Sequence, residues 1–300
     1  MKPRAWFSAL RAHFLTATAA PVLVGTAVAW YAAGSFDLVN FLLAFFGGIL
    51  IQLAANMSND YFDFVSETDS KNRSFSAYSG GSRVIQKGLI PARHILIAAI
   101  ACFAVGSGIG VLLVVKLRSI PLLAIGLLGV FCAYFYTATP LRLGYRGFAE
   151  LLNGVSFGPI VVLGAYAVQA PLWSATAILA SIPPGLLLAV VLMINEFPDF
   201  DSDRVVGKNT FVVLLGKRTA LSVYHAVLLT PFLWVPGFVI AGIFPAWTLL
   251  SLLSLPFAWS AYRVSRKHYM DNTKIVAANM NTFLLQLAFS PLFALGFFLG

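Results

Sequence analysis

The stretch VNFLLAFFGGILIQLAANM at residues 39–57 contains no acidic or basic side chain, and it leads directly into SNDYFDFVSETD at 58–69, which holds four acids. Apolar stretches of about 17 to 25 residues are long enough to cross a bilayer as a helix. We therefore expect a membrane-spanning helix that ends at a cluster of carboxylates.

The composition extends this expectation to the whole chain. Of its 300 residues, 59% are hydrophobic and only 10% are charged, far from the balance of a soluble domain. We expect an all-α integral membrane protein, residues 1–300 forming a single membrane domain in which nine transmembrane helices make one bundle and cytoplasmic loops cap a central cavity. The expected spans are 15–33, 39–57, 95–115, 119–137, 149–169, 173–195, 219–241, 245–262 and 277–299.

The charge distribution predicts how the chain lies in the membrane. With nine spans, 18 of the 20 basic residues fall on one side and only Lys116 and Arg118 on the other. By the positive-inside rule, the N-terminus and the acid clusters are cytoplasmic and the C-terminus is on the opposite side of the cell inner membrane. The net charge of +9 is thus accounted for by the bilayer, and we expect no nucleic acid partner.

A second acid cluster, NEFPDFDSD at 195–203, follows the sixth expected span. Each cluster opens one of the two long cytoplasmic loops, at about 58–94 and 196–218. Asn56, Asp60 and Asp63 are four and three residues apart, so they share one helical face. Asn195, Asp199 and Asp203 are four and four apart, and they also project together if the helix continues through Pro198. Such dense negative charge at a membrane boundary requires cations to offset it.

Oxygen ligands without His or Cys select Mg²⁺, for which Mn²⁺ is an expected substitute. Two such clusters can hold metal between them with a bridging diphosphate. We expect the catalytic carboxylates to be Asp60, Asp63, Asp199 and Asp203, and the metal ligands to be these four with Asn56, Asn59 and Asn195. The basic residues expected to neutralise the diphosphate are Arg83, Lys87, Arg146, Arg204 and Lys208. Glu196 and Asp201 point away from the Asp199 and Asp203 face on helical spacing.

The two motifs together resemble a known family. N-x-x-x-D-x-x-D at 56–63 and D-x-x-x-D at 199–203, each at a helix end, are similar to the marks of the UbiA-type intramembrane aromatic prenyltransferases. VIQKGLI at 84–90, YTATPLRLGYRGFAEL at 136–151 and DRVVGKNTFVVLLGKRTA at 203–220 look like the dihydroxynaphthoate branch. The chain departs from that branch at Asn195–Asp199, where it reads NEFPD in place of a second Asn followed by Arg-Asp.

The resemblance implies a transferase. Its substrates would be a polyprenyl diphosphate and an aromatic quinone precursor, with 1,4-dihydroxy-2-naphthoate in menaquinone biosynthesis favoured over 4-hydroxybenzoate, homogentisate or a glycerophosphate lipid. The metal would assist departure of diphosphate, and the resulting allylic cation would be attacked by a ring carbon as the ring carboxylate is lost. A further acid is implied. It is Glu67 in many members, where we expect contact with substrate, and Asp69, as a metal ligand, in the naphthoate branch.

Roles are also expected for residues outside the two motifs. The faces of Tyr134 and Tyr136 can stabilise the cation, and the alternative role for either tyrosine is in the interfacial aromatic belt. Tyr136 is also expected at the diphosphate. Arg11 matches a similarly placed arginine of the family and would contact substrate. Arg146 and Glu150, four residues apart, are expected to form an ion pair.

Two other classes of protein are alternatives to an enzyme. A secondary transporter usually binds its substrate near the bilayer midplane on broken helices, whereas both clusters are expected at the cytoplasmic edge. A scaffold protein would use the clusters only to bind a partner. The paired motifs favour the enzyme.

Overall fold

The computed structural model describes residues 3–66, 81–170 and 174–300. Helices account for the regular elements of this part of the chain. Their bounds are α1 Pro3–Leu10, η1 Ala12–Leu15, α2 Thr16–Ala33, α3 Leu38–Val65, α5 Ala92–Leu117, α6 Ile120–Phe135, η2 Leu143–Tyr145, α7 Ala149–Val155, η3 Ser156–Ile160, α8 Val161–Ala167, α9 Ala175–Val205, α10 Phe211–Ile240, η4 Ala246–Ser254, α11 Leu255–His268 and α12 Val276–Leu299.

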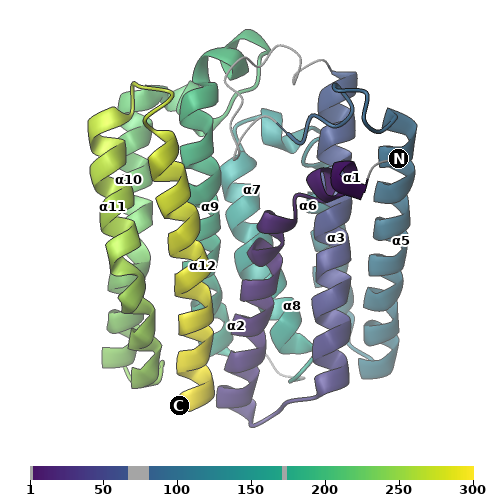
Figure 1. Ribbon diagram of the computed structural model, residues 1–300. Coiled ribbons are helices and arrows are strands. Elements are labelled where there is room, and N and C mark those ends of the chain that lie inside the picture. The colour runs from purple at the N-terminus through teal and green to yellow at the C-terminus, as the bar shows by residue number, and fades with distance from the viewer. Residues whose placement is uncertain (1–2, 67–80, 171–173) are drawn as a thin grey trace.

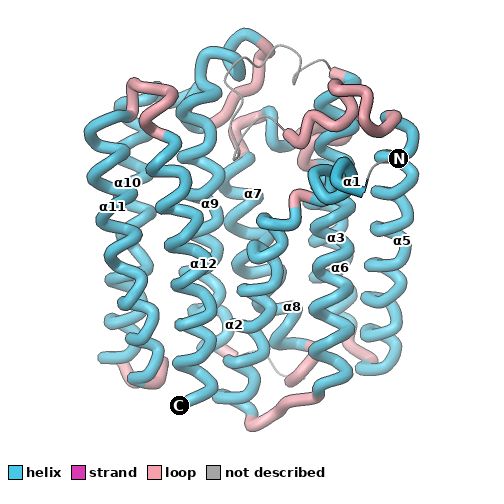
Figure 2. The backbone as a smooth tube through the Cα atoms, in the orientation of Figure 1, coloured by secondary structure: helices cyan, strands magenta, loops and turns pink. Residues whose placement is uncertain are grey.

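The long helices lie side by side in one bundle, joined by loops at its two ends (Figures 1 and 2). Within the described residues, seven helices are long and apolar enough to cross a membrane: α2, α3, α5, the continuous segment Ala149–Ala167, α9, α10 and α12. The remaining two expected spans are shorter or divided. α6 has 16 residues, and 246–268 is split into the 3₁₀ helix η4 and α11. An all-helical membrane protein is confirmed, while the count of nine stays a prediction.

Two helix ends lie further along the chain than expected. α3 continues to Val65 and α9 to Val205, so Asp60, Asp63 and the four acids at 196–203 are on the last turns of helices and not in loops. A prediction from hydropathy ends a span where charged residues begin. The helix itself continues wherever its backbone hydrogen bonds are made. Pro198 lies inside α9, so the helix does survive this proline. α10 begins at Phe211, but its backbone is non-helical at Gly216, so the helix that contains the expected span 219–241 starts just after this kink.

Glycines allow the central helices to approach one another closely. A Cβ at Gly25 of α2 would lie 2.2 Å from the Val162 carbonyl oxygen of α8, and one at Gly185 of α9 would lie 2.5 Å from the Gly154 carbonyl oxygen of α7. Close backbone contact through small residues is a common way of packing helices in membranes. The π-helical turn η3, which contains Pro159, interrupts the α7–α8 segment next to these contacts.

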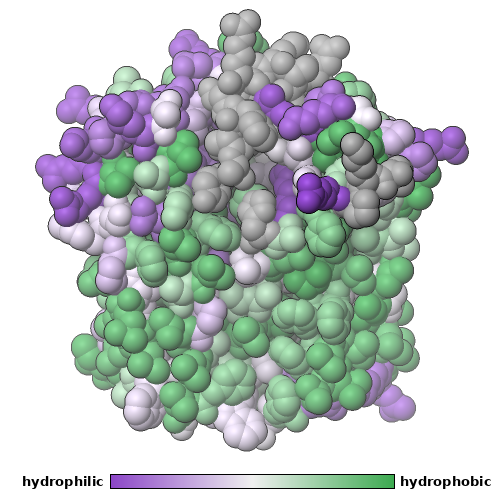
Figure 3. All heavy atoms as spheres, viewed as in Figure 1, coloured by the Kyte–Doolittle hydropathy of each residue, from purple (hydrophilic) through white to green (hydrophobic). Residues whose placement is uncertain are grey.

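The two ends of the bundle differ in polarity. Hydrophobic side chains form a wide belt, and hydrophilic ones gather at the end where α3 and α9 finish (Figures 1 and 3). At the opposite end, Lys116 Nζ donates to Asn40 Oδ1 at 2.7 Å and lies 3.8 Å from Asp37 Oδ2. The belt and polar ends match the pattern of an integral membrane protein.

Candidate active site

A cavity of about 960 Å³ opens inside the bundle, lined by α2, α3, α5, α6, α7–α8 and α9. Its polar end contains Asp63 and Asp203, and its apolar end reaches Leu43 and Leu122. Leu43 and Asp63 are twenty residues apart on α3, which corresponds to about 30 Å at 1.5 Å per residue. The cavity therefore has a charged end at Asp63 and Asp203, called the head below. A long hydrophobic part, called the shaft, extends from it toward Leu43 and Leu122.

The first motif is held by hydrogen bonds around Asp63. One carboxylate oxygen accepts from the Tyr145 hydroxyl, and the other accepts from Asn59 Nδ2 at 3.0 Å. Asn56 lies about one turn before Asn59 on α3 and also lines the cavity. Its side-chain amide donates to the Leu10 carbonyl at 3.3 Å. Asn56, Asn59 and Asp63, which are three and four residues apart on α3, thus line the cavity, whereas Asp60 of the predicted face is not among the lining residues.

Asp60 has a different environment. It is 2% exposed, forms an ion pair with Arg11 and accepts from both the hydroxyl and the backbone N–H of Ser82. Arg11 and Ser82 line the cavity. Asp60 thereby anchors the chain on either side of the first motif, and it holds the Arg11 guanidinium at the site.

The second motif lies on the last turns of α9. Asp199 and Asp203 are buried and line the same cavity, as does Asn195, whose side-chain amide contacts that of Asn279 on α12 at 3.0 Å. Lys208 Nζ is 3.6 Å from Asp203 Oδ2. Burial by itself would lower the pKa of Lys208, but nearby negative charge, that of Asp203 foremost, raises this pKa well above its usual range. The ammonium group therefore stays charged at the head of the cavity.

The loops after α6 and α9 join the two motifs. Asn209 N–H donates to the Tyr145 carbonyl at 3.0 Å, and Arg146 pairs with Asn209 in an isolated β-bridge. Tyr145 itself contacts Asp63 through its hydroxyl, while its ring lies 5.7 Å from Lys208 Nζ and 4.0 Å from the Arg142 guanidinium. Asp63 of the first acid cluster and Asp199 and Asp203 of the second, distant in sequence, consequently share one polar compartment.

The donor chemistry of this compartment fits a divalent cation that is completed by a substrate. Its oxygen donors come from Asp63, Asp199 and Asp203 with the amides of Asn56, Asn59 and Asn195, and Asp203 Oδ2 is buried without a hydrogen-bond partner in the described part of the chain. Within that part, no group of three or more His, Cys, Asp or Glu is arranged to hold a metal alone. Mg²⁺ commonly binds through one or two carboxylates and substrate phosphates, which this arrangement permits.

The structure separates the other expected residues into two groups. Tyr136 lines the cavity. Tyr134 is instead 37% exposed and packs edge-on against Phe62 and Phe103. Lys87 and Arg146 are exposed, with Arg146 donating to the Pro140 carbonyl at 3.2 Å. Arg204 is exposed, and Arg83 is half-buried directly after Ser82. Glu67 and Asp69 lie outside the described residues.

The expected ion pair between Arg146 and Glu150 is wrong. Glu150 is 3% exposed, and its Oε1 accepts from the Phe211 backbone N–H at 2.8 Å, at the start of α10. The spacing rule assumes one continuous helix, but α7 begins only at Ala149, so Arg146 lies in the preceding loop. Glu150 instead ties α7 to α10.

Three residues of the site are not predicted by the sequence pattern. Tyr145 and Ser82 contact the first motif, and Glu196 is 4% exposed and lines the cavity, although helical spacing set it apart from Asp199 and Asp203. Tyr145 lies within a quoted stretch of resemblance, 136–151, but its partner Asp63 is 82 residues away. No local pattern predicts a contact of this kind.

The fold and the site define a helical membrane protein with a polar-headed, apolar cavity, and comparison with known proteins gives its class. The family model described as "UbiA prenyltransferase family" matches residues 18–295. The chain belongs to the UbiA prenyltransferase family, which confirms the resemblance and the expectation of a prenyl-transferring enzyme.

Curated relatives and solved structures agree with this family. The chain is 32% identical over 277 residues to the 1,4-dihydroxy-2-naphthoate octaprenyltransferase of Bacillus subtilis, covering 91% of this chain and 87% of that one. It is 31% identical to the enzyme of the same name from Escherichia coli, covering 100% and 96%. The apo structure of a UbiA homolog from Aeropyrum pernix has the same fold, with a TM-score of 0.69, 20% identity and coverage of 96% and 97%. A UbiA homolog from Archaeoglobus fulgidus, solved with GPP and Mg²⁺, matches with a TM-score of 0.65, 14% identity and coverage of 96% and 99%.

Proposed function

We propose that this protein transfers a polyprenyl group from its diphosphate to 1,4-dihydroxy-2-naphthoate, with release of diphosphate and CO₂, in menaquinone biosynthesis. The observation that carries the proposal is the cavity, in which Asp63, Asp203 and Lys208 lie at one end of a hydrophobic shaft. The naphthoate acceptor rests on the names of the Bacillus and Escherichia relatives.

The two ends of the cavity suit the two parts of a polyprenyl diphosphate. The diphosphate would lie at the head, where Lys208 and Arg11 supply positive charge and where bidentate or charge-assisted hydrogen bonds to phosphate are strong. The prenyl chain would extend along the apolar wall toward Leu43 and Leu122. A shaft of about 30 Å, from the rise of α3, accommodates a long hydrocarbon chain.

The residues of the head would bind Mg²⁺ as well as diphosphate. We assign the metal to Asp63, Asp199 and Asp203 with the amides of Asn56, Asn59 and Asn195; the Archaeoglobus homolog, solved with GPP and Mg²⁺, supports a divalent ion. When bound, Mg²⁺ supplies charge that stabilises the departing diphosphate. Asp60 would hold Arg11 in place, and Glu67 or Asp69 would complete the ligand set.

Bond breaking and bond making would take place where the head meets the shaft. As the prenyl C–O bond breaks, Lys208 and Arg11 would stabilise the charge that develops on diphosphate. The allylic cation left behind would face Tyr136, whose ring can stabilise it. The acceptor ring carbon would then form the new C–C bond, and the electrons of the departing carboxylate would restore the aromatic ring.

The orientation in the membrane follows from the polar end of the bundle. We propose that the end containing the two motifs is cytoplasmic, that residues 1–300 act as one domain, and that the C-terminus lies on the other side. The hydrophilic surface at that end (Figure 3) and the positive-inside rule support this orientation.

The test is product formation by purified protein in detergent or vesicles. It would be incubated with Mg²⁺, a radiolabelled polyprenyl diphosphate and either dihydroxynaphthoate, 4-hydroxybenzoate, homogentisate or glycerol phosphate, and the product identified by mass. A decarboxylated prenyl-naphthoquinol formed only with Mg²⁺ or Mn²⁺ is expected. Turnover of another acceptor in preference to the naphthoate, or turnover unaffected by EDTA, would overturn the assignment.

A further inference from the structure

Polar side chains continue down the cavity wall below the acid clusters. Gln52 lies one turn deeper than Asn56 on α3, about 6 Å along the helix axis, and Asn153 faces the cavity from α7. Amide side chains in a membrane-embedded interior are costly unless they hydrogen-bond, and they commonly mark a binding site. Neither amide belongs to the acid motifs.

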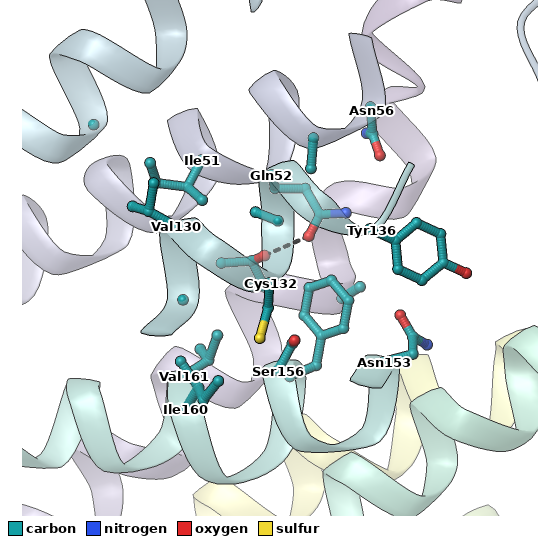
Figure 4. A pocket seen from close by; sticks show the side chains of 18 of the residues that line it. Ile51, Gln52, Asn56, Val130, Cys132, Tyr136, Asn153, Ser156, Ile160 and Val161 are labelled. Atoms are coloured by element: carbon teal, nitrogen blue, oxygen red, sulfur yellow. Dashed lines mark hydrogen bonds between the residues drawn. The ribbon is translucent and has the colours of Figure 1, made fainter. Parts of the chain in front are cut away.

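Each of these amides has one end fixed by the protein. Thr18 donates its hydroxyl to Gln52 Oε1 at 2.6 Å, and this bond orients the amide so that its NH₂ group is left for another partner. Asn153 Nδ2 donates to the Leu188 carbonyl at 2.6 Å, which leaves its carbonyl oxygen for another partner. In Figure 4 the Gln52 nitrogen and the Asn153 oxygen both point toward Tyr136. The cavity thus presents a fixed donor on one wall and a fixed acceptor on another.

A donor and an acceptor on different walls are complementary to a ligand with two oxygen substituents. One oxygen must accept from Gln52, and the other must carry a hydrogen to donate to Asn153. A carboxylate cannot pair with the Asn153 carbonyl oxygen, because both groups only accept hydrogen bonds and would repel each other. A prenyl chain carries neither a hydrogen-bond acceptor for Gln52 nor a donor for Asn153.

We propose that Gln52 and Asn153 form the binding site for the ring hydroxyls of an aromatic diol. This inference rests on the proposed function and names the residues that select its acceptor. One hydroxyl oxygen of the ring accepts from Gln52, and the other hydroxyl donates to Asn153. The ring then lies beside Tyr136, below the diphosphate head, where its carbon can meet the prenyl cation. A monohydroxy acid can satisfy both amides only if its carboxylate accepts from Gln52 and its single hydroxyl donates to Asn153.

The test uses Gln52→Leu and Asn153→Leu, with Gln286→Leu as the matched control. Gln286 is a fully buried glutamine of α12 whose amide atoms have no hydrogen-bond partner in the described part of the chain, and it is not among the residues that line the cavity. Steady-state KM values would be measured separately for dihydroxynaphthoate and for the prenyl diphosphate. Binding of the acceptor without Mg²⁺ or diphosphate would be followed by quenching of tryptophan fluorescence.

Each cavity variant is expected to raise the KM and the dissociation constant for the acceptor about three- to tenfold, the loss of one hydrogen bond. The KM for prenyl diphosphate should change less than twofold, and Gln286→Leu should change neither. Monomethyl ethers of the acceptor extend the test. An ether that cannot donate to Asn153 should bind wild type and Asn153→Leu equally weakly, because the same bond is missing in both.

Two kinds of failure are distinguishable. If wild type prenylates dihydroxynaphthoate but both variants keep the wild-type acceptor KM, the inference is wrong and the proposed function stands. The same holds if the variants raise the KM for prenyl diphosphate instead, which would place the prenyl chain at these amides. If wild type prenylates no aromatic acceptor, both are overturned. Size-exclusion elution and melting temperature identify a variant that has not folded, and Gln52→Asn, which retains an amide, then replaces Gln52→Leu.

Discussion

The Tyr145 hydroxyl donates a hydrogen bond to the Asp63 carboxylate, joining the loop after α6 to the end of α3. The Tyr145 carbonyl accepts from Asn209, in the loop after α9. A single residue therefore connects both halves of the acid site. Its contribution is to hold Asp63 toward the cavity while α9 presents Asp199 and Asp203.

Tyr145→Phe should weaken the response to Mg²⁺ without unfolding the protein. Among the described residues, removing the hydroxyl leaves Asn59 as the side-chain hydrogen-bond partner of the Asp63 carboxylate. Loss of about 1 kcal/mol of hydrogen bonding corresponds to a roughly fivefold higher Mg²⁺ concentration at half-maximal activity. Turnover would be titrated against Mg²⁺, and melting temperature recorded with Mg²⁺ and diphosphate. Tyr224→Phe is the control, because it removes a buried hydroxyl that bonds Thr282 outside the cavity. An equal Mg²⁺ response in both variants would show that Tyr145 does not position Asp63.

Asp199→Asn and Asp203→Asn should each reduce prenyl transfer by about 10² to 10³, the scale of losing one electrostatic group of a catalytic site. Folding should be kept, because asparagine has nearly the same shape and removes a buried negative charge. Asp37→Asn is the matched control at the opposite end: Asp37 caps α3 by accepting from Asn40 N–H at 2.8 Å, and asparagine caps equally well. Product formation per folded protein is the measurement. Wild-type rates in both α9 variants would remove the second motif from the reaction.

Lys208→Met should raise the KM for prenyl diphosphate tenfold or more, while Lys208→Arg should restore much of the affinity. The ammonium group is held 3.6 Å from Asp203 and faces the position proposed for phosphate, so its loss removes a charge-assisted contact. Lys274→Met serves as the control, since Lys274 is 65% exposed and pairs with Asp271 on the surface. Competition by inorganic diphosphate would measure the affinity directly. If Lys208→Met weakens acceptor binding alone, the diphosphate lies elsewhere.

The helical class and the two acid-bearing helix ends could be predicted from the sequence because both depend on local patterns. Long apolar runs require helices in lipid, and Asn56 to Asp63 share a face by helical spacing alone. Lys208 and Tyr136 were expected at the site and do line the cavity.

Other features depended on contacts that no local pattern records. Glu150 bonds Phe211, which is 61 residues away in sequence, and Tyr145 bonds Asp63, which is 82 residues away. Tyr134 and Tyr136 are two residues apart and were not distinguished, although only Tyr136 lines the cavity. Which side of a short helix end faces inward is decided by the packing of α6 against its neighbours. The ends of α3 and α9 were misplaced for a related reason, since both helices continue beyond the apolar run.

The close packing beside the cavity gives a last prediction, which concerns stability. A Cβ at Gly185 would lie 2.5 Å from the Gly154 carbonyl oxygen and 3.1 Å from Gly158 Cα, and backbone atoms cannot move aside as a flexible side chain can. Gly185→Ala should therefore cost about 1 to 3 kcal/mol, the usual penalty for overpacking, and lower the melting temperature in detergent. Gly237→Ala is the control, because nothing lies within 4 Å of its Cβ position and alanine is the better helix former. If Gly185→Ala has the melting temperature of wild type while that of Gly237→Ala differs, α7 and α9 are not in contact at this point.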